Sequence, residues 1–399
     1  MRGALSPTLR RLMAARLARS IAQGALVVDF ALYARRLGWS ATTLGLIFAL
    51  AIGFAVIVTA IIGPASDRFG RRRFLLIYEG LSLGSALLAL GSRAFLPVVL
   101  AAILGGFGRG ANGAAGPFAP AEQSWMAALV PPNQRGAVLS LNASLGFFGM
   151  SAGALLAGLI GPVQAMFALP LLAAMIAFAL LWLSPDVTPE AKPVPGDTPR
   201  EAAQAAQSQA RLERGLLWRL AGLNLLNGAG IGMVGPFMSW WFATRFGVGA
   251  AAIGPAFAVS FIAAGVASLI AGSLTSRFGT LRIVVIMRGL GLISLLALPF
   301  MPSFGGAVVL YALRSALNRG TAGARQAVAM GLVRQRRGLA ASVNTLSMMA
   351  PRAVAPAFAG ALFSEGALIV PFLIAGLFQG AYLVLYPIAF ANHDQSRPS

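Results

Sequence analysis

Several ionised side chains stand inside long apolar runs of this sequence, among them Asp29, Arg109, Arg314, Arg319 and Arg352. A charged group in such a run is costly in lipid and marks an ion or substrate pathway by default. Asp29 is the candidate proton carrier, because burial disfavours the ionised form of a carboxylate. Arg109 is expected to adjust that proton binding, and the other three arginines are candidate substrate-binding residues. Asp29 could instead be an outer-rim residue paired with nearby arginines.

Carboxamide side chains accompany these charges. Asn112 follows Arg109 by three positions, Asn318 precedes Arg319, and Asn224 and Asn227 are spaced so that they share a helix face. We expect all four to line a path for substrate. The chain has no cysteine and a single histidine in its C-terminal tail, and the acids inside its apolar runs are dispersed. This excludes the nucleophile–base pairs and metal ligands that a membrane-embedded enzyme needs. No catalytic residue, metal or cofactor is expected; a non-transporting receptor remains an alternative.

Composition sets the elements that must position these residues. Hydrophobic residues make up 58% of the chain and charged residues 11%, whereas soluble domains carry about 25% charged residues. Apolar runs of about 20 residues are long enough to cross a bilayer as helices, and only helices satisfy the backbone of such isolated runs. The sequence therefore predicts an all-α polytopic membrane protein embedded in the lipid bilayer. The net charge of +20 does not indicate nucleic-acid binding, because the basic residues gather in alternate loops.

Twelve apolar runs are predicted to span the membrane, the first as a retained span and not a cleaved signal. Most arginines fall in the inner loops of this arrangement, so the positive-inside rule places both termini in the cytoplasm, with the protein in the cell (inner) membrane. The predicted spans are 14–34, 43–65, 74–92, 95–117, 137–160, 163–183, 216–242, 252–275, 283–301, 304–324, 339–362 and 367–391.

A polar, proline-containing stretch divides the chain into two halves. We predict an N-terminal six-helix bundle at 1–184, a cytoplasmic linker at 185–215 whose second part is helical, and a C-terminal six-helix bundle at 216–399. The segment 63–89 aligns without gaps on 272–298, which identifies a parallel internal repeat. Such repeats in transporters place the binding site between the halves, near the membrane midplane.

The stretch "GPASDRFGRRRF" at 63–74 joins the second and third predicted spans. Gly63 permits close approach of a neighbouring helix, and Gly70 permits the positive φ angle of a tight reversal. Asp67 is expected to pair with a neighbouring arginine, Arg68 or Arg71, as a latch that holds one conformation and opens in another. Arg72 and Arg73 could serve only to anchor the topology.

These features resemble the major facilitator superfamily (MFS), whose signature matches Gly63-x-x-x-Asp67-Arg68-x-Gly70-Arg71-Arg72-Arg73. The run Arg109-x-x-Asn112-Gly113 is similar to an Arg-x-x-Gln-Gly motif of its proton-coupled members. The resemblance implies two six-helix bundles, a cavity lined by spans one, four, seven and ten, and a latch role for Asp67 and Arg71. Glu122 could replace the acid usual at the inner end of span four, where this chain has Ala128.

Within that family the chain resembles the proton-coupled drug or metabolite efflux branch, although its antiporter signature at 153–158 is partial, with Ala154 in place of proline. The predicted function is alternating-access transport of a small organic solute, as proton-coupled efflux of hydrophobic compounds by a monomer. The alternative is an organic-anion uptake symporter or exchanger that uses the intramembrane arginines. Glu79 and Arg288, which occupy equivalent positions in the repeat, are predicted to be interfacial.

Overall fold

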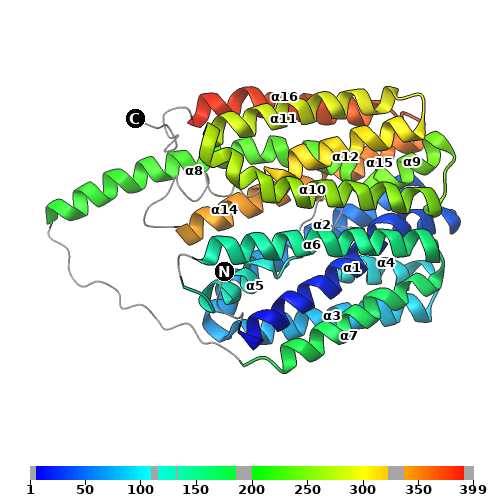
Figure 1. Ribbon diagram of the computed structural model, residues 1–399, viewed down its shortest axis with the longest axis horizontal. Coiled ribbons are helices and arrows are strands. Elements are labelled where there is room, and N and C mark those ends of the chain that lie inside the picture. The colour runs from blue at the N-terminus through cyan, green and yellow to red at the C-terminus, as the bar shows by residue number, and fades with distance from the viewer. Residues whose placement is uncertain (1–5, 109–115, 132–133, 186–199, 322–336, 391–399) are drawn as a thin grey trace.

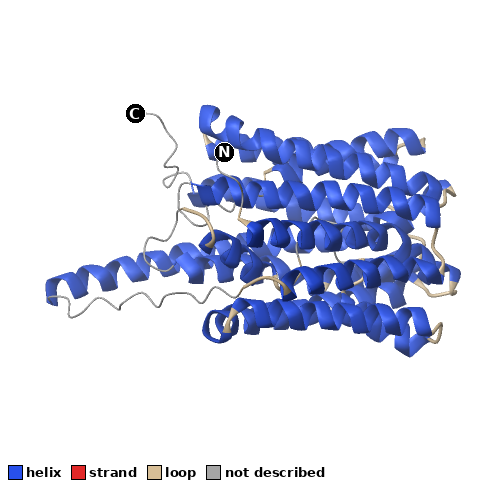
Figure 2. Cartoon of the chain, turned by 60° about the horizontal axis from the view of Figure 1, so that its bottom comes forward, coloured by secondary structure: helices blue, strands red, loops and turns tan. Residues whose placement is uncertain are grey.

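The computed structural model describes residues 6–108, 116–131, 134–185, 200–321 and 337–390, and every regular element in these ranges is helical. Ten helices there are long and apolar enough to cross a membrane, and Phe95–Gly105 is a shorter apolar helix. The helices run side by side along the long axis of the molecule (Figures 1 and 2). The predicted all-helical membrane fold is therefore confirmed.

The N-terminal bundle is built around α1, which packs against α6 and α7. Its elements are α1 (Pro7–Arg36), α2 (Ala41–Phe69), α3 (Arg71–Gly91), α4 (Phe95–Gly105), α5 (Ala119–Ala128), α6 (Arg135–Ile160), η3 (Gln164–Phe167) and α7 (Ala168–Trp182). Glycine allows the α1–α6 contact, since a Cβ atom at Gly153 would lie 1.8 Å from the Ile21 carbonyl oxygen. This close packing fixes the rotation of α1, which carries the charged residues discussed below.

The C-terminal bundle repeats this arrangement with more interrupted helices. Its elements are α8 (Arg200–Val234), η4 (Gly235–Phe237), α9 (Met238–Phe246), α10 (Ala250–Phe278), α11 (Thr280–Ala297), η5 (Leu298–Phe300), α12 (Phe304–Gly320), α14 (Arg337–Met349), η6 (Pro351–Ala353), α15 (Ala355–Ser364) and α16 (Val370–Phe390). Helix α8 begins in the polar stretch and projects beyond the bundles before it joins them (Figure 1). Prolines at positions 236 and 351 accompany the breaks at η4 and η6.

The internal repeat is visible in the backbone. Gly70 separates α2 from α3 with φ of 93°, and Gly279 separates α10 from α11 with φ of 84°. These angles are strained for residues with a Cβ atom. The positive φ predicted for Gly70 is confirmed, and its counterpart in the second half has the same conformation.

The two bundles share an apolar core at one end of the molecule. We call the end from which α8 projects the linker end and the opposite end the far end. At the far end a single cluster combines residues of both bundles, and the rings of Phe48 on α2 and Phe237 on η4 meet edge to face at 5.6 Å. There the Ser364 hydroxyl of α15 accepts a hydrogen bond of 2.9 Å from the Thr42 backbone N–H of α2.

At the linker end the apolar clusters of the described residues stay within their own bundles. One includes Leu12, Leu75 and Trp125 of the N-terminal bundle, and the other includes Leu220 and Tyr382 of the C-terminal bundle. The bundles are therefore joined most firmly at the far end.

Candidate functional site

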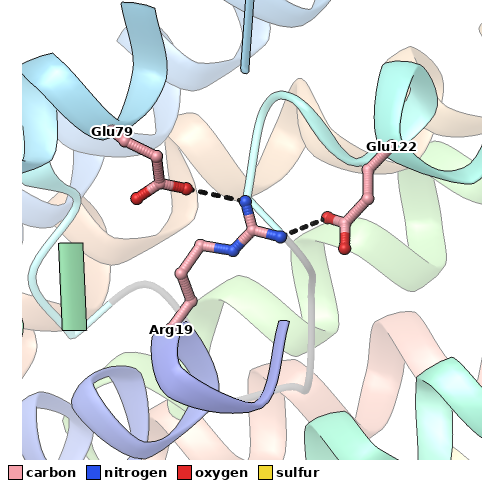
Figure 3. A network of polar contacts seen from close by, with 3 residues as sticks. All are labelled: Arg19, Glu79 and Glu122. Carbon is pink, nitrogen blue, oxygen red and sulfur yellow. Dashed lines mark hydrogen bonds and ion pairs between the residues drawn. The ribbon is translucent and has the colours of Figure 1, made fainter. Parts of the chain in front are cut away.

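A buried charge cluster lies inside the N-terminal bundle (Figure 3). Arg19 of α1 places its guanidinium between two carboxylates from different helices. Its Nη1 is 2.8 Å from Oε1 of Glu79 on α3, and its Nη2 is 2.8 Å from Oε2 of Glu122 on α5. All three residues are buried. The cluster thus ties together three helices that lie far apart in the sequence.

A second guanidinium and two small cavities accompany these ion pairs. Arg16 lies one turn before Arg19 on α1 and is also buried. A cavity of about 40 Å³ is lined by Arg19, Gln23, Tyr78 and Glu79, among others. Another of about 10 Å³ touches Arg16, Arg19 and Glu122. The larger cavity has room for water beside Arg19, Gln23 and Glu79.

The charge balance of this cluster suits reversible protonation. Arg16 and Arg19 together balance Glu79 and Glu122 when both acids are ionised. Among the four, the salt bridges of the described residues join only Arg19 to the carboxylates. A proton taken up by either carboxylate therefore leaves one complete ion pair in place.

The cluster corrects an interpretation drawn from the sequence. Glu79 and Arg288 were predicted to be interfacial, but Glu79 is 0% exposed and Arg288 4% exposed. Arg19, near the start of the first predicted span, is a buried ion-pair partner, a role that the sequence does not indicate. The signal in the sequence was a charge of each sign near the linker ends of neighbouring apolar runs. Nothing in the sequence shows which way each helix turns them.

Asp29 lies ten residues beyond Arg19 on α1, in the far-end part of the bundle. It is buried, and neither of its carboxylate oxygens accepts a hydrogen bond from the described residues. Arg35 donates to Thr244 and Arg36 to the Pro162 carbonyl. Asp29 is thus buried and not open to water at the rim, and no salt bridge joins it to these arginines in the described residues. Its role as a proton carrier stays a prediction.

The predicted latch residues are only partly brought together. Arg71 is buried at the start of α3 and donates from Nη1 to the Ser124 carbonyl of α5 at 3.1 Å. Arg68 is exposed and stacks on the Phe69 ring, 5.3 Å from its centroid. Gly63 and Asp67 lie in α2, but their side chains are outside the described structure. Glu122, also predicted to join the latch, contacts Arg19.

Two asparagines predicted to bind substrate contact other residues of the C-terminal bundle. Asn224 of α8 donates from Nδ2 to Oδ1 of Asn344 at 2.9 Å and to the Ser347 hydroxyl at 3.1 Å, both on α14. Asn227, one turn later, accepts a hydrogen bond from Nη2 of Arg288 on α11. The guanidinium of Arg288 lies 4.9 Å from the centroid of the Tyr382 ring. The predicted shared face of Asn224 and Asn227 thus connects α8 to two helices of its own bundle.

The remaining predicted residues lie apart from the Arg19 cluster. Arg314, Asn318 and Arg319 all lie on α12, and Arg352 lies on η6 in the interrupted helix between α14 and α15. Arg109 and Asn112 are outside the described residues. Within the described ranges, no group of three or more histidine, cysteine, aspartate or glutamate residues could hold a metal ion.

Two helical bundles that enclose charged groups within apolar helices define a membrane transporter, and comparison with known proteins identifies the family. The model of the Major Facilitator Superfamily matches residues 12–223 and again residues 220–398. The chain therefore belongs to the Major Facilitator Superfamily, whose members here are transporters and not enzymes. The double match agrees with the internal repeat. None of the curated proteins matches the chain.

Solved transporters share the fold across nearly the whole chain. A bacterial homolog of the human lysosomal transporter Spinster, in an inward-facing and unoccupied conformation, has a TM-score of 0.69 at 15% identity, covering 99% of this chain and 98% of that one. The nucleoside transporter NupG gives 0.71 at 11% identity, with 96% and 100% covered. The human organic anion transporter MFSD10 gives 0.66 at 16% identity, with 95% and 98% covered. At these identities the likeness shows the fold alone.

Proposed function

We propose that this protein is a proton-coupled secondary transporter that exports hydrophobic organic compounds by alternating access. The observation that carries the proposal is the pair of buried carboxylates, Glu79 and Glu122, held on the single guanidinium of Arg19 beside a polar cavity. A coupling site must bind and release a proton inside the membrane without collapse of its surroundings. The cluster meets this need, because one ion pair survives when either acid is protonated.

The membrane arrangement completes the proposal. Twelve spans form two six-helix bundles with boundaries at 1–184 and 216–399, the 185–215 linker and both termini are cytoplasmic, and a monomer works in the cell (inner) membrane. The linker end is then the cytoplasmic side. Bundles that share an apolar core at the far end and have separate cores at the linker end fit a state that loads its solute from the cytoplasm. That is the loading side of an exporter.

In this mechanism Glu79 or Glu122 takes up a proton through the water-sized cavity and releases it when the bundles rearrange. Arg19 keeps the remaining carboxylate ionised by direct pairing. Asp29 acts as a further proton carrier in the far-end half of α1, and Arg109 adjusts proton binding from the fourth span. Asp67, Gly70 and Arg71 with their neighbours Gly63 and Arg68 form the latch that opens and closes the cytoplasmic side.

Proteoliposomes with an imposed pH gradient and an internal pH-sensitive dye test the proposal. A panel of lipophilic cations, neutral aromatic compounds and organic anions is added to the native protein and to Glu79→Gln, Glu122→Gln and Asp29→Asn. We expect at least one solute to trigger proton flux. Each glutamine variant should reduce that flux, and both should still exchange labelled solute. Glu365→Gln, which alters an exposed acid in a far-end loop, is the matched control.

Undiminished proton flux in the double variant Glu79→Gln/Glu122→Gln would contradict the cluster as the coupling site. Loss of flux in Asp29→Asn alone would move the proton site to Asp29. Solute exchange with no proton movement for any compound would contradict proton coupling altogether.

A further inference from the structure

From residue 216 to residue 364, the C-terminal bundle contains arginines but no acidic residue. The sequence has no aspartate or glutamate anywhere in 216–364, and the acids beyond are Glu365 in a far-end loop and Asp394 in the tail. Yet Arg288, Arg314 and Arg319 lie within its helices, and Arg288 and Arg314 are buried. The positive charge of this bundle is thus not balanced by its own side chains.

Arg314 is the most isolated of these charges. It is 7% exposed on α12, its Nε is enclosed without a hydrogen-bond partner, and no salt bridge joins it to any residue that the structure describes. A guanidinium cannot shed its proton in a protein, and a buried charge without an opposite charge is strongly unfavourable. An anion from outside the chain would remove this imbalance.

The surroundings of Arg314 combine aromatic rings with a second guanidinium. Tyr311, one turn earlier, packs its ring against Phe257 of α10 with centroids 5.2 Å apart. Its hydroxyl is 3.5 Å from Nη2 of Arg319, and the guanidinium of Arg319 lies 4.9 Å from the Phe261 ring centroid. A second guanidinium and an aromatic hydroxyl thus lie on the same helix as Arg314.

We propose that Arg314, with Arg319 and Tyr311, binds the oxyanion of the transported compound, a carboxylate or phosphate on an organic body. A guanidinium binds such groups with two parallel hydrogen bonds. The inference deepens the proposed function, on which it rests: the hydrophobic compound carries an acidic group that binds in the C-terminal bundle, while the proton binds at Arg19, Glu79 and Glu122 in the N-terminal bundle. The headgroup of an anionic lipid has the same chemistry and must be distinguished by experiment.

The test uses full-length protein in phosphatidylcholine nanodiscs and three probes of one shape: 2-naphthoate, the neutral 2-naphthamide and the cationic 2-(aminomethyl)naphthalene. Binding is measured by equilibrium titration and by the rise in melting temperature. We expect naphthoate to bind in preference to the other two. Arg314→Ala should weaken naphthoate binding by roughly 10- to 100-fold, and Arg314→Lys by less. Arg277→Ala, at an exposed arginine, should leave binding unchanged.

A second readout separates ligand binding from a structural role. Removal of an uncompensated charge should not lower the melting temperature of the empty protein, so Arg314→Met should melt at the same temperature as the native chain or higher. A lower melting temperature combined with unchanged naphthoate affinity would overturn the proposal. Preference for the cationic probe would overturn it as well.

A separate measurement tests whether the bound oxyanion is a lipid headgroup. If phosphatidylglycerol nanodiscs stabilise the native protein but not Arg314→Met, and naphthoate does not bind in either lipid, the bound oxyanion belongs to lipid and the solute assignment fails. Lipophilic cations that drive proton flux without any binding of naphthoate would refute this inference and leave the proposed function intact. Naphthoate binding that depends on Arg314, without any coupled proton flux, would support the inference and refute proton coupling.

Discussion

The two bundles have polar side chains at equivalent positions of the repeat, but the charges of these side chains differ. In the N-terminal bundle Arg19 on α1 pairs with Glu79 on α3; in the C-terminal bundle Asn227 on α8 accepts from Arg288 on α11. Glu79 and Arg288 are 209 residues apart in the sequence, as are Gly70 and Gly279. Arg19 and Asn227 are 208 residues apart, so they also occupy nearly equivalent positions of the repeat. The contact between the first and third helices of the bundle recurs in both halves, but the third helix contributes an acidic residue, Glu79, in one half and a basic residue, Arg288, in the other.

This difference indicates that the repeat fixes backbone geometry and leaves the side chains free to specialise. The glycines at the two helix reversals adopt nearly the same φ angle, because a turn requires that angle whichever bundle contains it. Charge has no such constraint. The N-terminal bundle pairs a buried arginine with two buried acids, whereas residues 216–364 of the C-terminal bundle include arginines and no acid.

The largest expected effect comes from removing the arginine of each copy. Arg19→Ala leaves two buried carboxylates without their ion-pair partner and should lower the free energy of unfolding by about 3–5 kcal/mol. Arg288→Ala leaves only a neutral amide and a phenol without their partner and should cost about 1–3 kcal/mol. Unfolding of both variants in detergent, compared with the native chain, measures the difference. Equal losses would show that the two copies are not electrostatically distinct.

A charge transplant sharpens the comparison. Arg288→Glu alone puts a buried carboxylate beside Asn227, and Asn227→Arg alone puts two arginines together, so each should be destabilising. The double variant recreates the N-terminal pair, and the two changes should couple favourably by about 1–3 kcal/mol in a double-mutant cycle. Additive losses in unfolding free energy would mean that the side chains of the second copy do not meet as those of the first do.

The smallest expected effect concerns Asn142 and Asn344, which end the similar segments RGAVLSLN (135–142) and RGLAASVN (337–344). Asn344 accepts a hydrogen bond from Asn224, so Asn344→Ala should cost about 1 kcal/mol. The Oδ1 atom of Asn142 is buried without a hydrogen-bond partner in the described structure. Asn142→Ala should therefore cost less, as seen in a smaller drop in melting temperature. A larger loss at Asn142 would reverse this assignment.

Much of the fold was accessible from the sequence because its causes are local. Apolar runs long enough to cross a bilayer predict helices, and the aligned segments at 63–89 and 272–298 predict two related halves. The conformation of Gly70 followed from its place in a short link between two such runs. The presence of charges in apolar segments, from which the transport roles of Asp29 and Arg314 are predicted, was also a local signal.

The composition of the Arg19 cluster was decided by tertiary structure. Glu79 and Glu122 lie on α3 and α5, and the hydropathy of a helix does not determine how it is rotated about its own axis. An acid near a helix end can therefore face lipid, water or a neighbouring helix. Close packing of α1 against α6 at Gly153 fixes the direction in which Arg19 points, and α3 and α5 then bring the two acids to it. The sequence by itself determined that the helices exist and which charges they carry. Only their packing decided which charges meet, because ion pairing depends on distances of a few ångströms between helices that hydropathy does not orient.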